Sequence, residues 1–136
     1  MDTNNEFAYR NLVVYQHAKA YAKYVYQLMD NFPHKEEYAL CAQLRRSSIS
    51  VPSNIAEACG RYSKKQQLHF LEFAFGSLNE TVCQMEIACD FNYIDDDQMH
   101  EIEIRAIGIK KMLSGWRKTL ISQLSQSPKD SESFCL

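Results

Sequence analysis

The feature that most constrains the fold is the recurrence of apolar residues at intervals of three and four in four successive segments. In residues 11–32 this spacing places one apolar face on a helix, made of Leu12, Tyr15, Ala18, Ala22, Val25, Met29 and Phe32. Only four Gly and three Pro interrupt the 136 residues, which favours long helices over many short strands. Short connections force neighbouring helices to run antiparallel. The predicted fold class is therefore all-α, an antiparallel up-down-up-down four-helix bundle.

The ends of these helices carry local signals. Pro33 stops the first pattern, and Gly60 is expected to end the second helix, residues 36–59, as a left-handed cap. Pro52 lacks a backbone N–H and its ring crowds the carbonyl of Ser48, so we expect the second helix to be kinked near Pro52. Capping boxes predict the starts of the last two helices, from Ser63 with Gln66 and from Asp95 with Gln98.

These patterns divide the chain into three parts. Residues 1–10 form an N-terminal lead, residues 11–124 form the bundle, and residues 125–136 are expected to be a disordered tail because they lack an apolar period. No run of about 18 apolar residues is present, so no membrane partner is expected. The first six residues lack the basic and apolar regions of a signal peptide, which predicts a cytoplasmic protein.

The sequence lacks the common motifs for catalysis or for holding a cofactor. The sequence has no Gly-rich phosphate loop, no His-Glu-x-x-His helix and no nucleophile elbow. A di-iron bundle needs Glu-x-x-His pairs on two helices, and the nearest approach is Asp97-x-x-His100 alone. The five cysteines form no Cys-x-x-Cys pair and are interpreted as structural thiols. We therefore expect no enzymatic activity, no catalytic residues, no metal site and no cofactor.

Four separate segments carry a resemblance to a known family: Leu12–Tyr15, Gln43–Arg46, Ser50–Glu57 and Phe75–Glu80. Over residues 7–124 the chain resembles the four-helix-bundle proteins encoded in intervening sequences of bacterial 23S ribosomal RNA genes. The resemblance implies a ring-like homopentamer without established catalysis. The chain is also similar to the accessory variability protein of diversity-generating retroelements, a basic pentamer that works with a reverse transcriptase and binds nucleic acid. The residues carried over as family motif and candidate interface are Arg45, Arg46, Asn54, Glu57, Gly76, Ser77 and Glu80.

Polar residues recur every three or four positions along the second helix, at Arg46, Ser50, Asn54, Glu57 and Arg61. One interpretation is a solvated surface that includes a Glu57–Arg61 pair. Another is a hydrogen-bonded network between subunits, and catalytic use is a third. Since no active site is completed around this stripe, recognition between helices or between subunits is the preferred interpretation.

Gly76 lies in the middle of the third helix, where Gly costs about 1 kcal/mol relative to Ala. A close approach of a neighbouring helix would explain this glycine. Tyrosines are frequent in the first helix and just after it, and some of them are expected at an oligomer contact.

Charge is segregated along the chain, although the formal net charge is only −2. Residues 72–103 contain nine acids and neither Lys nor Arg, while residues 104–124 contain five cations and no acid. An up-down topology brings one group of cations to the same end of the bundle, here called the basic pole: Arg10, Arg61, Lys64, Lys65, Arg117 and Lys118. Such a pole, repeated around a ring, would suit RNA or an acidic protein surface.

Two main functions are left open by the sequence, and a metal-dependent bundle enzyme is a third class that no complete ligand set supports. The first is a non-enzymatic, homo-oligomeric and pentameric bundle that acts as an interaction scaffold. The alternative is an RNA-binding accessory protein of an intervening or mobile genetic element, with RNA or a nucleic-acid enzyme as partner and the basic pole as contact surface. Nonspecific affinity for phosphates grows with the number of cationic contacts, so at this net charge any RNA contact has to be local.

Overall fold

The computed structural model describes residues 6–126, and within them the chain forms four long α-helices and two short 3₁₀ turns. The elements follow the order η1 (Ala8–Asn11), α2 (Val13–Met29), η2 (His34–Glu36), α3 (Leu40–Gly60), α4 (Lys64–Asp90) and α5 (Asp96–Ser125). The described part of the chain contains no strand. The predicted all-α four-helix bundle is therefore confirmed.

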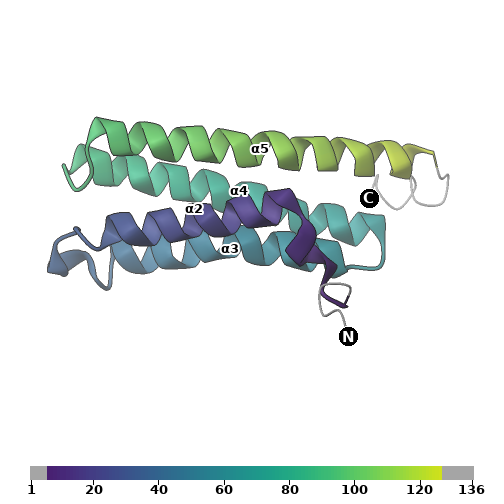
Figure 1. Ribbon diagram of the computed structural model, residues 1–136, viewed down its shortest axis with the longest axis horizontal. Helices are drawn as coiled ribbons and strands as arrows, with labels where there is room; N and C mark the ends of the chain where they lie inside the picture. The colour runs from purple at the N-terminus through teal and green to yellow at the C-terminus, as the bar shows by residue number, and fades with distance from the viewer. Residues whose placement is uncertain (1–5, 127–136) are drawn as a thin grey trace.

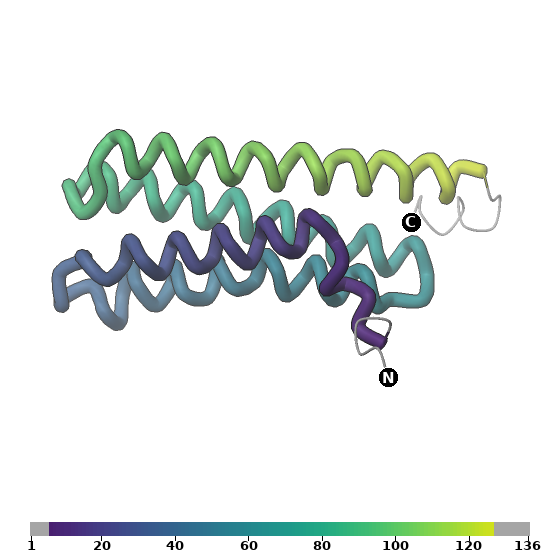
Figure 2. The backbone as a smooth tube through the Cα atoms, in the orientation of Figure 1, coloured from purple at the N-terminus to yellow at the C-terminus, as the bar shows by residue number. Residues whose placement is uncertain are grey.

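The four helices run alternately up and down (Figure 1). Each packs against two others, α3 on α4, α4 on α5, α2 on α3 and α2 on α5, so α4 lies diagonally opposite α2. The start of α2, the α3–α4 connection and the end of α5 share one end of the bundle, and the other two connections share the opposite end (Figure 1). At the first end η1 packs against both α2 and α3 (Figure 2).

The core of the bundle is formed by buried side chains from all four helices. Its largest fully buried members come from all four helices: Tyr21, Val25, Leu44, Val51, Ile55, Leu71, Leu78, Met85, Ile102, Ile109, Leu113 and Leu124. All but one of these are apolar and without polar atoms, as expected for a bundle held together by the removal of apolar surface from water. Tyr21 is the exception, because its hydroxyl is buried and no hydrogen-bond partner lies near it among the described residues.

The helix ends confirm some of the local predictions and correct others. At the start of α5, Asp95 accepts from the backbone N–H of Gln98 at 2.7 Å and Gln98 Oε1 accepts from the backbone N–H of Asp95 at 2.9 Å, a complete capping box. At α4 only half of the predicted box is seen, since Ser63 accepts from Gln66 at 3.1 Å.

The left-handed cap predicted at Gly60 was wrong. Gly60 is the last residue of α3 and has no positive φ. The left-handed position is Asn92, with φ 64°, after α4. There the N–H of Tyr93 reaches the carbonyl of Ala88 at 2.9 Å, which ends α4 in a Schellman motif.

Pro52 lies inside α3, which continues through it as one helix. The kink expected there stays a prediction. Residues 127–136 of the expected tail lie outside the described residues. No helix in the described part is both long enough and apolar enough to cross a bilayer.

Candidate functional site

The α3–α4 packing contains a layer of polar side chains, here called the polar seam. Its buried members are Ser47 on α3 and Thr81 and Gln84 on α4, each at most 5% exposed. Ser47 Oγ donates to Gln84 Oε1 at 2.7 Å, and Thr81 Oγ1 donates to the carbonyl of Ser77 at 2.8 Å. Thr81 Oγ1 also lies 3.2 Å from Ser47 Oγ, so three buried polar side chains from two helices meet at one level of the bundle.

The seam continues outward in both directions along the two helices. Toward the basic pole, the hydroxyl groups of Ser50 and Ser77 are 2.8 Å apart, and Asn54 Nδ2 donates to the carbonyl of Ser50 at 2.8 Å. Asn54 Nδ2 also lies 2.9 Å from Ser50 Oγ. In the other direction, Gln84 Nε2 lies 3.2 Å from Glu80 Oε1 and 3.3 Å from Gln43 Oε1. Directional bonds of this kind set the register of one helix against its neighbour.

Ion pairs border the seam where it meets solvent. Arg46 contacts Glu80 at 3.4 Å, and Arg61 contacts Glu57, four residues earlier, at 2.8 Å. These side chains are between 39% and 74% exposed, so each pair contributes at most about 1 kcal/mol. The Glu57–Arg61 pair predicted from the sequence is thus confirmed. Arg45 points the other way, donating to the carbonyl of Glu37 at 2.7 Å and fixing the connection that precedes α3.

The family-motif residues have different local roles. Arg46, Ser77 and Glu80 take part in contacts between α3 and α4. Asn54 bonds to Ser50 within α3, and Arg45 and Glu57 form ion pairs with Glu37 and Arg61. Gly76 does not serve the close helix approach that was expected, because a Cβ at this position would find no atom of another helix within 4 Å. Gly76 is exposed on the outer side of α4, and the close approach inferred from the sequence was wrong.

The buried part of the seam was not identified from the sequence. Ser47, Thr81 and Gln84 occupy positions on the core faces of α3 and α4, between buried apolar neighbours such as Leu44 and Met85. The sequence did contain a signal, namely polar residues at core positions of two helices that were expected to be neighbours. Such residues need hydrogen-bond partners when they are buried. The rotation of each helix about its axis had to be known before these residues could be paired.

The six cations of the basic pole lie near one end of the bundle, but half of them have local partners. Arg61 lies over the ring of Phe70 at 4.5 Å in addition to its contact with Glu57. Arg117 lies over Phe75 at 4.1 Å and contacts Glu72 at 3.3 Å, and Arg10 lies over Phe7 at 4.8 Å.

The remaining cations of the pole are Lys64, Lys65 and Lys118, which are exposed and form no ion pair among the described residues. Between Arg61 and Lys64 in the α3–α4 connection stands Tyr62, whose side chain is fully exposed. Sequence reasoning missed Tyr62. A fully exposed aromatic ring next to free lysines is the combination on which single-stranded bases stack.

Two of the cysteines, Cys41 and Cys59, are poorly suited to nucleophilic chemistry. Burial is the main cause that raises the pKa of Cys41 and of Cys59 above the ordinary thiol value, which keeps both protonated near neutral pH. The four cysteines of residues 6–126 are free thiols. At the end of the bundle that holds the α2–α3 and α4–α5 connections, Tyr93 donates to Glu36 Oε2 at 2.8 Å, and this hydrogen bond raises the pKa of Tyr93.

No group of three or more His, Cys, Asp or Glu side chains within residues 6–126 is arranged to hold a metal ion.

Comparison with known families identifies the protein family to which the chain belongs. The model of the family described as 23S rRNA-intervening sequence protein matches residues 10–115, well over half of the 136 residues. The chain belongs to this family. The match to the 23S rRNA-intervening sequence proteins includes the whole polar seam and Tyr62, whereas Arg117 and Lys118 lie beyond it. No curated protein matches the chain.

Proposed function

We propose that this 23S rRNA-intervening sequence protein is a non-enzymatic, homo-oligomeric interaction scaffold of the cytoplasm, with five subunits. The observation that carries the proposal is a set of exposed large apolar side chains on the outer faces of α4 and α5. They are Phe73, Ile87, Ile104 and Ile107, each between 39% and 51% exposed. The core is complete without them, so both helices carry apolar residues on two opposite sides. Apolar patches on an outer surface mark sites of association.

Light scattering on the purified chain tests the proposal directly. The expected mass is five times the 15.8 kDa of one chain, at micromolar concentration and moderate salt. A single-chain mass under the same conditions would reject the scaffold function. Another stable multiple would keep the scaffold and reject five subunits.

A second function is supported by a separate observation, the exposure of Tyr62 beside the free lysines of the basic pole. In this alternative the chain is an RNA-binding accessory protein of an intervening or mobile genetic element. Tyr62 offers a face for base stacking, while Lys64 and Lys65 contact phosphates. Since every phosphate contact releases a counterion, affinity falls steeply as salt is raised.

Fluorescence anisotropy with a labelled single-stranded RNA separates this alternative from the first function. Lys64→Glu combined with Lys65→Glu is expected to weaken binding at least tenfold and to flatten its salt dependence, because two phosphate contacts are lost. Tyr62→Ala is expected to weaken binding with an unchanged salt slope. The matched control, Lys110→Glu with Lys111→Glu, makes the same charge change away from the pole. Equal losses for both charge pairs, or no RNA binding at any salt concentration, would argue against an RNA contact at the pole.

A further inference from the structure

Two apolar surfaces lie on different sides of the bundle, and the charged residues that border one are opposite in sign to those that border the other. The first is the outer stripe of α4, formed by Phe73, Gly76, Cys83 and Ile87 and by Phe91 just after the helix. All five residues are exposed, with Phe73 at 48% and Phe91 at 57%. They repeat at intervals of three, seven and four, which places them on the side of α4 opposite the core.

The outer stripe is open near its Phe73 end, at Gly76. Gly76 has no atom of another helix near the position of a Cβ, so nothing within this chain explains a glycine there. A mid-helix glycine costs about 1 kcal/mol relative to alanine. An incoming side chain from a second molecule has room to lie against the backbone at this point.

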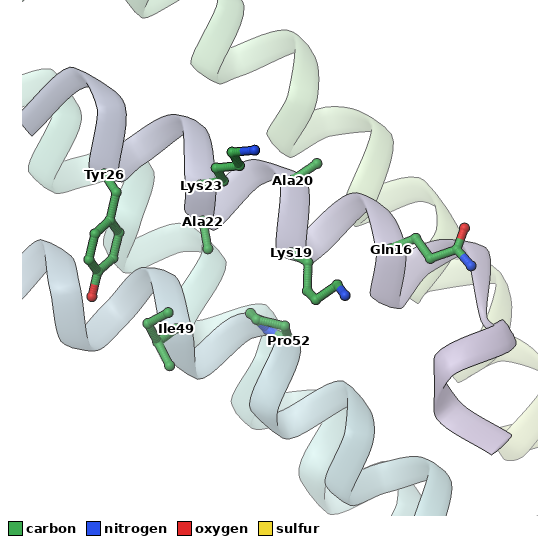
Figure 3. A pocket seen from close by; sticks show the side chains of 8 residues that line it. All are labelled: Gln16, Lys19, Ala20, Ala22, Lys23, Tyr26, Ile49 and Pro52. Carbon is green, nitrogen blue, oxygen red and sulfur yellow. The ribbon is translucent and has the colours of Figure 1, made fainter. Parts of the chain in front are cut away.

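The second surface is a groove between α2 and α3 of about 690 Å³. Figure 3 shows Ala22 and Tyr26 of α2 pointing toward α3, where Ile49 and Pro52 face them. Lys19 extends beside Pro52 at one end of this α2–α3 groove (Figure 3). Ile49 is 46% exposed, so the groove presents apolar surface to solvent.

The charges around the two surfaces are complementary. Lys19 and Lys23 border the α2–α3 groove, and no acid is among the residues that line it. Lys19 Nζ lies 5.3 Å from the centre of the Tyr15 ring, and neither lysine forms an ion pair within residues 6–126.

The outer stripe has acids along it and no cation between residues 66 and 104. Among these acids, Glu72 and Glu80 have arginine partners, at 3.3 and 3.4 Å. Glu86 and Asp90 are exposed and have no ion-pair partner in the described part of the chain. Glu86 lines a groove between α4 and α5 with Lys110 of the same chain, but no ion pair joins these two side chains in the described residues. Glu86 and Asp90 can therefore meet a lysine of another molecule.

This charge pattern decides how two copies can meet. Stripe against stripe would bring together two surfaces that have acids and no cation between residues 66 and 104, and groove against groove would bring together the Lys19 and Lys23 side chains of two molecules. Like charges facing each other at an interface are unfavourable, so neither two-fold arrangement suits these surfaces. Stripe against groove pairs opposite charges and leaves one free stripe and one free groove on every dimer. Such a head-to-tail contact propagates and forms a ring when its rotation closes.

We infer that the outer stripe of α4 in one copy docks into the α2–α3 groove of the next copy. The inference rests on the proposed scaffold function, for which it supplies the contact between subunits. Ile87 enters the groove against Ile49 and Pro52, while Glu86 and Asp90, which flank Ile87 on α4, meet Lys19 and Lys23. Since α4 is diagonal to α2 within one bundle, a chain does not satisfy its own groove.

Charge exchange tests the pairing. Lys19→Glu with Lys23→Glu, and separately Glu86→Lys with Asp90→Lys, are each expected to reduce the light-scattering mass to that of one chain. All four changes in one chain are expected to restore the wild-type mass, because the charges are complementary again. The matched control is Lys111→Glu with Lys118→Glu, which makes the same charge change on exposed positions of α5 and is expected to keep the oligomer. Circular dichroism verifies that each variant retains its helices.

A cross-link provides a second readout that does not depend on dissociation. Cys83 is an exposed free thiol on the outer stripe. In an Ile49→Cys variant, oxidised glutathione is expected to join Cys83 of one chain to the new thiol of the next, with the glutathione disulfide reduced as the protein disulfide forms. A ladder of dimers, trimers and larger species on a non-reducing gel is expected, and it should disappear when Cys83→Ala is added.

The outcomes separate this inference from the proposed function. A wild-type chain of single mass would reject the scaffold itself. A wild-type oligomer whose mass is insensitive to both charge reversals, or not restored by the fourfold exchange, would overturn the stripe–groove contact and leave the scaffold standing. A cross-linking pattern that stops at dimers would also overturn it, since head-to-tail contacts must extend further.

Discussion

Replacing Ser47 by alanine removes one hydroxyl from the centre of the polar seam. Ser47 is only 2% exposed, and its hydroxyl donates to Gln84 Oε1 at 2.7 Å. Without it, the buried amide oxygen of Gln84 loses its donor, which costs about 1–3 kcal/mol. Alanine regains roughly 0.5 kcal/mol through its better helix propensity. We expect a net loss of about 1–2 kcal/mol in the free energy of unfolding.

The measurement is urea unfolding followed by circular dichroism, at one fixed protein concentration because association would otherwise shift the transition. In a thermal scan the same loss corresponds to a decrease of about 3–6 °C for a chain of this size. Ser53→Ala is the matched control, because Ser53 lies in the same helix with an exposed side chain. We expect the control to change stability by less than about 0.5 kcal/mol.

A double-mutant cycle tests whether the Ser47–Gln84 hydrogen bond is responsible for the loss. Gln84→Met removes the partner amide while conserving most of its volume, and removing both partners together is expected to cost less than the sum of the single changes. A coupling energy of about 1 kcal/mol is expected between Ser47 and Gln84. If Ser47→Ala behaves like Ser53→Ala, or if the cycle shows no coupling, the hydrogen bond does not hold α3 against α4 as argued.

Three further changes have defined outcomes. Tyr21→Phe removes a buried hydroxyl without a partner, so the free energy of unfolding is expected to rise by up to about 1 kcal/mol. Burial raises the pKa of Tyr21 in the folded state, so the wild type loses stability as the pH rises above about 10, the pKa of tyrosine in the unfolded chain. A pH series of urea unfolding should show a smaller alkaline loss in the variant. Gly76→Ala is expected to raise the unfolding free energy by about 1 kcal/mol in a dissociated chain such as the Lys19→Glu/Lys23→Glu variant, since a Cβ there meets nothing; a decrease in the denaturant midpoint of that dissociated chain would contradict the open space. Asp95→Ala removes the cap of α5 and should cost about 1 kcal/mol, whereas Asp97→Ala, in the first turn without a capping bond, should cost a few tenths; equal thermal shifts would count against the capping box.

Local features of the chain were predictable because local physics governs them. The period of three and four reflects the geometry of a single helix, and the stop at Pro33 and the box at Asp95 depend on residues a few positions apart. The prediction at Gly60 failed although it was also local. Arg61 took an extended backbone conformation directly after α3, so no left-handed residue was needed.

The candidate site was predicted less completely than the fold. The polar stripe of α3 was recognised, as was the Glu57–Arg61 pair within it, but the buried partners on α4 were not. Thr81 and Gln84 are separated from Ser47 by more than thirty residues, so no short-range spacing links them. The exposure of Tyr62 was missed because the length of a connection does not determine which of its side chains points outward.

By itself the sequence determined that four amphipathic helices alternate in direction, that one end of the bundle is rich in cations, and that the chain has the motifs of its family. These properties depend on periodicity, chain connectivity and residue identity. Only the tertiary structure decided that the α3 stripe meets α4, that Gly76 faces open space, and that an acidic stripe and a basic groove lie on different sides. The physical reason is that the rotation and register of each helix are determined by packing against residues distant in the chain, and helical periodicity does not encode them.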